Sequence, residues 1–156
     1  MSTNAPQQAV IAFMRTPKNF PHACHSPEKF ETNQSHVFLM GDYAYKLFKA
    51  IKRYRDNTTP EARHENAKLE IQANRMLAPR LYLGIFAIAA QQNGQLTLQP
   101  VAKADTSRAV DYVVKMRRFD TKDLLYERLF AGDLTQREVY ALGDHVARFH
   151  QNQAPD

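Results

Sequence analysis

Short apolar segments separated by turn signals follow residue 27 and predict strands. The apolar stretches are separated by Asn33-Gln34-Ser35 and by Gly41-Asp42. A Gly-Asp pair between two such stretches is typical of a tight hairpin connection. We therefore predict a three-stranded antiparallel meander over residues 28–49. A short helix over residues 8–15 and a proline-containing loop are expected before it.

A helical pattern follows the meander. Thr59 and Pro60 form a favourable helix start, with a capping hydroxyl and a proline at the first helical position. Pro79 is expected to end the same helix. Apolar residues recur between them at four-residue steps and so share one face: Leu69, Ala73 and Leu77. The pattern predicts a helix over residues 61–77.

Strand-like segments return after this helix. They cover residues 85–90, 95–99 and 112–116. Asn93-Gly94 between the first two is the strongest local hairpin signal in the chain. The third segment belongs to a nearly continuous apolar run over residues 110–119, which suits a buried strand.

Two helices are predicted at the end of the chain. The first covers residues 123–130 and is stopped by Gly132. The second covers residues 135–152 and begins with a capping box, Thr135 followed by Glu138 three positions later. A sheet with one intervening helix, followed by helices alone, predicts the α+β fold class.

Composition adds limits on location and partners. The net charge of +5 suggests affinity for an anion such as a nucleotide, a nucleic acid or an acidic lipid, although many proteins of this charge have no such partner. The single cysteine, Cys24, excludes an intrachain disulfide. The N-terminus lacks a secretory-signal pattern, and the longest apolar run is too short to span a membrane. A cytoplasmic protein without a membrane partner is expected.

One pair of charged residues indicates a specific chemistry. Lys46 lies in a predicted strand, and Glu70 lies in the helix that follows. A strand lysine held by a glutamate from the next helix is how kinase-type folds grip nucleotide phosphates. Glu65 on the same helix is the weaker candidate partner, because it is expected to point elsewhere.

Three sequence blocks carry a family resemblance: residues 37–46 (VFLMGDYAYK), 70–84 (EIQANRMLAPRLYLG) and 114–119 (VKMRRF). In this order and spacing they resemble the aminoglycoside phosphotransferase-like family of the protein-kinase-like fold. The similarity is greatest to bacterial proteins that join such a domain to a P-loop ATPase or sugar-kinase-like domain.

The resemblance implies a fold and domain boundaries. It implies an N-terminal kinase lobe with an antiparallel sheet of about five strands and one packed helix, followed by the first helices of an incomplete C-lobe. Residues 1–27 would be a tail with a short helix, residues 28–119 the lobe with its hinge, and residues 120–156 the start of the helical C-lobe.

The resemblance also implies site residues. Lys46 would contact the α- and β-phosphates of ATP, and Glu70 would hold Lys46 in place. Residues 116–119 would form the hinge that reads the adenine edge. Val37, Ala44 and Met116 would line the adenine slot. Ser35 lies in the turn expected to cover the phosphates, although that turn lacks the Gly-x-Gly-x-x-Gly pattern, and Arg117 is a candidate to steer phosphates.

The chemistry of the family needs residues that this sequence does not contain. No His-x-Asp or His-Gly-Asp loop with a downstream Asn and Asp appears, so the expected ligands of Mg²⁺ are absent. Gly132-Asp133-Leu134 is interpreted as a helix stop. We therefore expect an ATP-binding lobe without its catalytic loop, in a family that phosphorylates small-molecule hydroxyls, and no catalytic or metal-binding residue is assigned.

Other functions remain open from the sequence. The last two helices could expose apolar faces for self-association or for a complementary C-lobe polypeptide. The positive charge could serve nucleic-acid binding, and residues 134–149 resemble the opening of a DNA-reading helix, although both are less favoured. His22, Cys24 and His25 suggest zinc, but no clear fourth ligand accompanies them.

Overall fold

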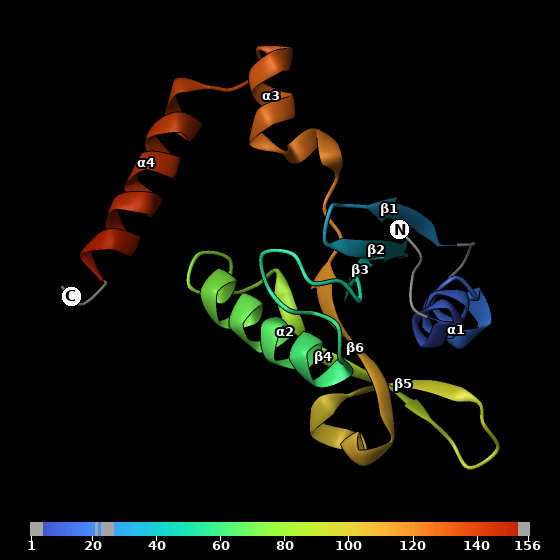
Figure 1. The fold of residues 1–156 in the computed structure, drawn as a ribbon. Helices are drawn as coiled ribbons and strands as arrows, with labels where there is room; N and C mark the ends of the chain where they lie inside the picture. Colours follow the sequence, from blue (N-terminus) through green and yellow to red (C-terminus); the bar gives the residue numbers. More distant parts are fainter. Residues whose placement is uncertain (1–4, 21, 23–26, 153–156) are drawn as a thin grey trace. The chain divides into compact units, whose positions relative to one another are not determined.

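The chain forms two compact units, Met1–Arg118 and Phe119–Asp156 (Figure 1). The computed structural model describes residues 5–20, 22 and 27–152. Residues 21 and 23–26 of the predicted proline-containing loop before the meander lie outside the described residues. Each unit is treated by itself below.

The first unit contains a six-stranded antiparallel sheet with the strand order β1-β2-β3-β6-β4-β5. The α+β class is confirmed, with six strands rather than about five. The strands are β1 (Glu28–Glu31), β2 (Ser35–Met40), β3 (Tyr43–Phe48), β4 (Tyr82–Ala90), β5 (Leu96–Pro100) and β6 (Ala109–Arg117). Short 3₁₀ turns lie at Pro17–Asn19, Val101–Lys103 and Thr106–Arg108.

The predicted meander is confirmed as β1, β2 and β3, each paired antiparallel to the next. Gly41 makes the turn between β2 and β3 with a φ of +54°, a region that side chains disfavour. A Cβ there would also lie 2.9 Å from the carbonyl oxygen of His22. Glycine is therefore required at this turn for two independent reasons.

The second hairpin is also confirmed. Gly94 has a φ of +79° in the turn that joins β4 to β5. β6 then enters the sheet between β3 and β4 and pairs with both. A bulge between Tyr82 and Gly84 interrupts the β4 register, and Arg75 donates hydrogen bonds to the carbonyls of Tyr82 and Leu83, both at 2.9 Å.

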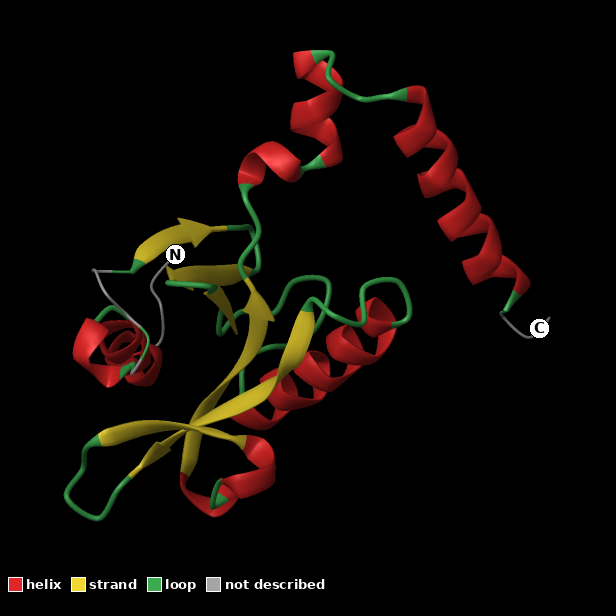
Figure 2. Cartoon of the chain, turned by 180° about the vertical axis from the view of Figure 1, so that it is seen from behind, coloured by secondary structure: helices red, strands yellow, loops and turns green. Residues whose placement is uncertain are grey.

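Two helices cover opposite faces of the sheet (Figures 1 and 2). Helix α1 (Ala5–Met14) is longer than the predicted short helix, and its buried residues form one cluster with Phe38, Tyr45 and Val113. Helix α2 (Pro60–Arg75) packs Ala67 and Ile71 against Phe48 and Val114. Successive strand residues point to opposite faces, so the sheet is apolar on both sides.

The second unit contains a 3₁₀ turn, Thr121–Asp123, and the helices α3 (Leu125–Ala131) and α4 (Gln136–Gln151). Gly132 ends α3 in the left-handed conformation, as predicted, with a φ of +71°. The predicted capping box of α4 is present, with Thr135 and Glu138 bonded in both directions. Large apolar side chains of both helices are exposed within the chain: Leu125, Leu129, Phe130, Val139, Leu142 and Val146.

None of the helices in the described residues has the length and apolar character that crossing a membrane requires.

Candidate functional site

Lys46 and Glu70 meet between the sheet and α2. Lys46 Nζ lies 2.7 Å from Glu70 Oε2, and the two side chains are 25% and 15% exposed. Lys46 Nζ also lies 5.1 Å from the ring centroid of Phe48. The ammonium is therefore held by one carboxylate and one aromatic ring, and a quarter of the Lys46 side chain remains exposed.

Local capping and pairing decide which glutamate of α2 meets the lysine. Thr59 caps the helix by accepting a hydrogen bond from the Ala62 N–H at 3.2 Å, as predicted. Glu65 points elsewhere and binds Lys68 at 2.7 Å. Glu70 lies five positions further along and faces the sheet, so it becomes the partner of Lys46.

Strand register places three of the predicted site residues on the same face as Lys46. Lys46 pairs with Val37 on β2, and Ala44 pairs with Met116 on β6. Residues directly opposite one another in antiparallel strands share a face, and Lys46 and Ala44 alternate with Tyr45, so all four point to the α2 side. Ala44 is buried, while Val37 and Met116 are partly exposed.

Tyr82 adds a polar group near the pair. It packs against the apolar cluster formed by Phe48, Ala67, Ile71 and Val114. Burial raises the pKa of the Tyr82 hydroxyl above 10.0, and the charge of Glu70 adds to this effect. Tyr82 is therefore a neutral hydroxyl at physiological pH, and the site combines a cation, a carboxylate and an apolar surface.

Ser35 lies at the end of the predicted turn, but its side chain is not open to a ligand. It is fully buried at the start of β2, and its hydroxyl lies 2.8 Å from the Thr32 hydroxyl. The turn signal at residues 33–35 was correct, but the Ser35 side chain serves that turn rather than an open surface. A phosphate contact by Ser35 is not compatible with this burial.

Arg117 lies on the wrong face for the predicted site. It pairs with Tyr43, which is adjacent to Ala44 in β3 and so points to the opposite face. Arg117 shares the face of Tyr43 and therefore points away from the α2 side. Its exposed side chain cannot share a ligand with Lys46 on the opposite face of the sheet. Arg118 forms an ion pair with Glu28 at 2.9 Å.

The expected adenine-reading hinge is partly engaged within the sheet. The N–H of Arg117 donates to the Leu81 carbonyl at 2.9 Å, and the N–H of Arg118 donates to the Asp42 carbonyl at 2.8 Å. These two donors are therefore not free to read a base, and no local pattern in the sequence indicates these long-range bonds.

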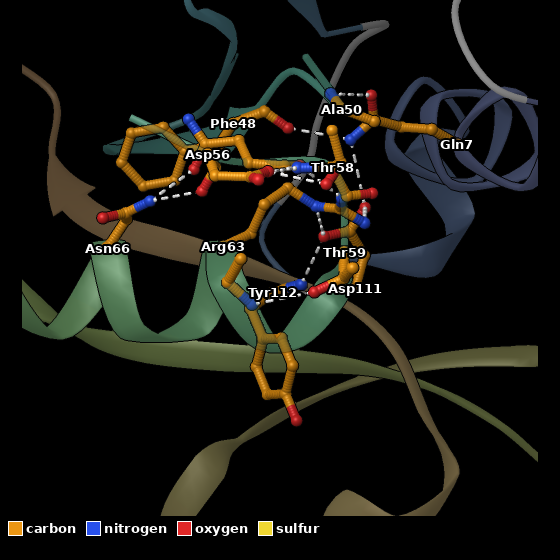
Figure 3. Close-up of polar contacts among 12 residues, drawn as sticks. Gln7, Phe48, Ala50, Asp56, Thr58, Thr59, Arg63, Asn66, Asp111 and Tyr112 are labelled. Atoms are coloured by element: carbon orange, nitrogen blue, oxygen red, sulfur yellow. Dashed lines mark hydrogen bonds and ion pairs between the residues drawn. The ribbon is translucent and has the colours of Figure 1, made fainter. Parts of the chain in front are cut away.

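A buried polar network that sequence reasoning missed fixes the position of α2 (Figure 3). Arg63 donates to both carboxylate oxygens of Asp111, at 2.7 and 3.0 Å, and the side chains are 4% and 0% exposed. Arg63 also donates to the carbonyls of Asn57 and Thr58. Gln7 of α1 donates to Asp111 at 3.2 Å and to the Phe48 carbonyl at 2.8 Å.

The network joins α1, β3, α2 and β6, so it holds the helix that carries Glu70 against the strand that carries Lys46. One signal was available in the sequence: Asp111 interrupts an otherwise apolar strand, and a buried carboxylate requires a partner. The identity of that partner could not be read from the sequence.

A second lysine lies on the other face of the sheet. Lys115 Nζ lies 3.7 Å from the ring centroid of Tyr43, and the rings of Tyr45 and Phe86 are also near. Burial lowers the pKa of the Lys115 amine, while the aromatic rings favour its charged form. Lys115 thus packs against aromatic rings of the sheet, and within residues 5–20, 22 and 27–152 it forms no ion pair like that of Lys46 with Glu70.

The structure describes one of the three residues that suggested a zinc site. Cys24 and His25 lie outside the described residues. His22 lies inside them, and its Nε2 is 3.2 Å from the Tyr45 hydroxyl. Within residues 5–20, 22 and 27–152, no group of three His, Cys, Asp or Glu side chains is arranged to hold a metal ion.

Comparison with known proteins gives relatives without an assigned function. Uncharacterized proteins of Mycobacterium bovis and of two Mycobacterium tuberculosis strains are each 30% identical to this chain over 122 residues. The alignment covers 78% of this chain but 22% of each relative, so the chain spans about a fifth of their length. No family model and no solved structure matches the chain.

Proposed function

We propose that the first unit is a nucleotide-binding lobe of the protein-kinase-like fold, related to the aminoglycoside phosphotransferase-like family. The ion pair between Lys46 on β3 and Glu70 on α2, at 2.7 Å, carries the proposal. The carboxylate orients the ammonium and accepts one of its three N–H groups, which leaves the others to donate to phosphate oxygens. ATP is the proposed ligand.

The apolar surface beside Lys46 supports this assignment. Val37 and Met116 share its face of the sheet, are partly exposed and offer an apolar surface to a flat base, while buried Ala44, which pairs with Met116, lies beneath this surface. A base would bury its face there while its phosphates reach Lys46. Ser35 and Arg117 are left out of the proposed site because their side chains are buried and oppositely directed, respectively.

Phosphoryl transfer is proposed only for a complete protein. The family reaction, phosphorylation of a small-molecule hydroxyl, needs a catalytic Asp and carboxylate ligands for Mg²⁺. The described residues contain no cluster that fits a metal ion. This chain alone would bind nucleotide and leave it unchanged, and the remaining groups would come from a further polypeptide segment.

The proposal predicts that nucleotide binding depends on Lys46. A fluorescent ATP analogue, titrated with and without Mg²⁺, should bind weakly to the unaltered chain. Lys46→Ala should raise the Kd at least about tenfold, since hydrogen bonds to charged groups contribute roughly 1.5–3 kcal/mol each. Circular dichroism should show that the variant keeps its fold.

Lys52→Ala is the matched control for this experiment. Lys52 also pairs with a carboxylate, Asp56, but at 4.0 Å and with a side chain 78% exposed. It removes the same charge from the same unit, so its titration should match that of the unaltered chain. Equal curves for Lys46→Ala and Lys52→Ala would exclude the site, and ATP turnover by the chain alone would contradict the absence of catalysis.

A second candidate function is partner binding through the helices of the second unit. Exposed Leu129, Phe130 and Val146, at 63%, 73% and 40%, favour it. Apolar surface of this kind is usually covered by another protein. Light scattering should show an oligomer that Phe130→Glu disrupts, with the neighbouring polar substitution Glu127→Gln as control. A monomer at all concentrations without binding of an apolar-surface dye would argue against this function.

A further inference from the structure

We propose that β5 is an association edge, which pairs antiparallel with β5 of a second copy of this chain. This inference is independent of nucleotide binding and uses a different surface from the helices of the second unit. It follows from the direction of backbone groups on β5 and from the absence of charge on this strand.

β5 is an outer strand of the sheet. It pairs with β4 on one side, and no strand of the described chain pairs with its other side. β1 occupies the opposite edge. An edge strand presents unpaired backbone N–H and C=O groups, which can template pairing with another strand.

The hairpin register identifies which groups point outward. The Gln91 N–H donates to the Gln95 carbonyl at 2.8 Å, so this position of the ladder is hydrogen-bonded. Bonded and non-bonded positions alternate in antiparallel pairs. Thr97, opposite Ala89, and Gln99 therefore bond to β4. The N–H and C=O groups of Leu96 and Leu98 point away from β4.

Pro100 agrees with this assignment. It takes the next outward-directed position and has no N–H to leave unpaired. Proline in a sheet is confined to positions where the N–H would face solvent. The side of β5 that faces away from β4 therefore offers the backbone N–H and C=O groups of Leu96 and Leu98.

The two edges of the sheet differ in charge. β1 has the sequence EKFE, and Glu31 forms ion pairs with Lys29 at 2.6 Å and with Lys49 at 3.1 Å. Charged side chains of this kind protect an edge from association. β5 has the sequence LTLQP and contains no charged residue. β5 thus lacks the charged protection that β1 has.

β5 is complementary to itself. With two-fold symmetry, Leu96 lies opposite Leu98 of the second copy, and every outward N–H of these residues meets an outward carbonyl. Thr97 then lies opposite Thr97, which is a favourable cross-strand pair. The strand has no charge, so antiparallel pairing brings no like charges together. The β5 strand of a second copy can therefore pair with this edge, because its hydrogen-bonding groups match and no like charges meet.

Amide exchange tests the pairing directly. The chain should form a dimer as its concentration rises, measured by analytical ultracentrifugation. Hydrogen exchange followed by NMR should then show slower exchange of the Leu96 and Leu98 amides at high concentration. The Thr97 and Gln99 amides, bonded to β4, should be protected at every concentration. A monomer throughout, or Leu96 and Leu98 exchange rates independent of concentration, would overturn the proposal.

Two variants separate this edge from the helices. Leu98→Pro removes one outward donor and none that bonds to β4, so it should abolish the dimer. Thr97→Lys keeps every backbone donor but places two ammonium groups opposite each other across the pair. Their repulsion should also abolish the dimer. Gln92→Lys adds an equal charge in the exposed turn and should dimerise normally. A dimer that survives Thr97→Lys but is lost in Phe130→Glu would refute the edge and assign association to the helices.

Discussion

His36 shows how much a single buried residue can influence the pH dependence of this protein. It is 4% exposed on β2, and neither ring nitrogen makes a hydrogen bond to another described residue. Its Nδ1 lies 3.5 Å from Glu31 Oε1, within ion-pair distance but without hydrogen-bond geometry. Burial lowers the pKa of the imidazole below 6.5, Lys29 and Lys49 lower it further, and Glu31 opposes them.

We predict that the free energy of unfolding falls as the pH drops below about 6.5. The imidazole titrates at 6.5 in the unfolded chain and lower in the folded one, so the unfolded state binds more protons within this window. The stabilising contribution is complete above 6.5 and is lost as the pH falls through the folded pKa. Urea denaturation at pH 7.5 and pH 5.5 measures the change.

His36→Gln should make this pH dependence shallower, because glutamine does not titrate. His22 and His64 also have pKa values lowered mainly by burial, so part of the dependence should remain. Glu31, whose pKa is lowered to about 2 chiefly by Lys29, acts only at more acidic pH. An identical loss of stability in the variant and the unaltered chain would contradict the role of His36.

Single-residue assignments made from the sequence succeeded where the local neighbourhood decides the outcome. Thr59 and Thr135 cap their helices, and Gly132 ends α3, because these roles involve residues within one turn. Arg117 was misplaced because the face on which a strand residue lies depends on the register of the whole sheet. Ser35 lies on the same face as Lys46 but is buried, and burial depends on the packing of distant segments.

At the scale of elements, the Arg63–Asp111 pair is the principal long-range connection of the first unit. It joins α2 to β6, and Gln7 links α1 to the same carboxylate (Figure 3). Helices α1 and α2 and strand β6 therefore converge on one buried carboxylate. The positions of these elements relative to one another depend on this pair.

We predict that Asp111→Ala lowers the free energy of unfolding by about 3–5 kcal/mol, because it leaves the Arg63 guanidinium buried without its partner. Chemical denaturation measures this loss. The double variant Arg63→Met/Asp111→Leu should recover much of it, since an apolar pair leaves no buried charge.

Lys68→Ala is the control for this measurement. Lys68 pairs with Glu65 at the surface, with side chains 51% and 66% exposed, and surface pairs contribute little. Its stability should remain close to that of the unaltered chain. A similarly small effect of Asp111→Ala would show that the buried pair does not hold these elements together.

At the scale of the whole molecule, the chain combines a six-stranded sheet covered by α1 and α2 with a separate helical unit. The relatives are more than four times longer than the region they share with it, since the alignment covers 22% of each. The proposed nucleotide-binding site lies in the first unit, and the proposed apolar partner-binding surface lies in the second. Both proposals are consistent with a protein that acts together with further polypeptide.

The sequence by itself determined the parts of this protein that depend on near neighbours. The turns at Gly41 and Gly94, the helix ends and the α+β order of elements all follow from short-range backbone preferences and from the spacing of apolar residues. The pairing of Lys46 with Glu70 was also anticipated, although through three separated blocks rather than through a local pattern.

Only the tertiary structure decided how distant segments meet. The placement of β6 between β3 and β4, the burial of Ser35, the direction of Arg117 and the partners of Asp111 all join residues far apart in the chain. Such contacts depend on strand register and packing, in which a shift of one residue moves every side chain to the other face. Short-range preferences carry no information about that choice.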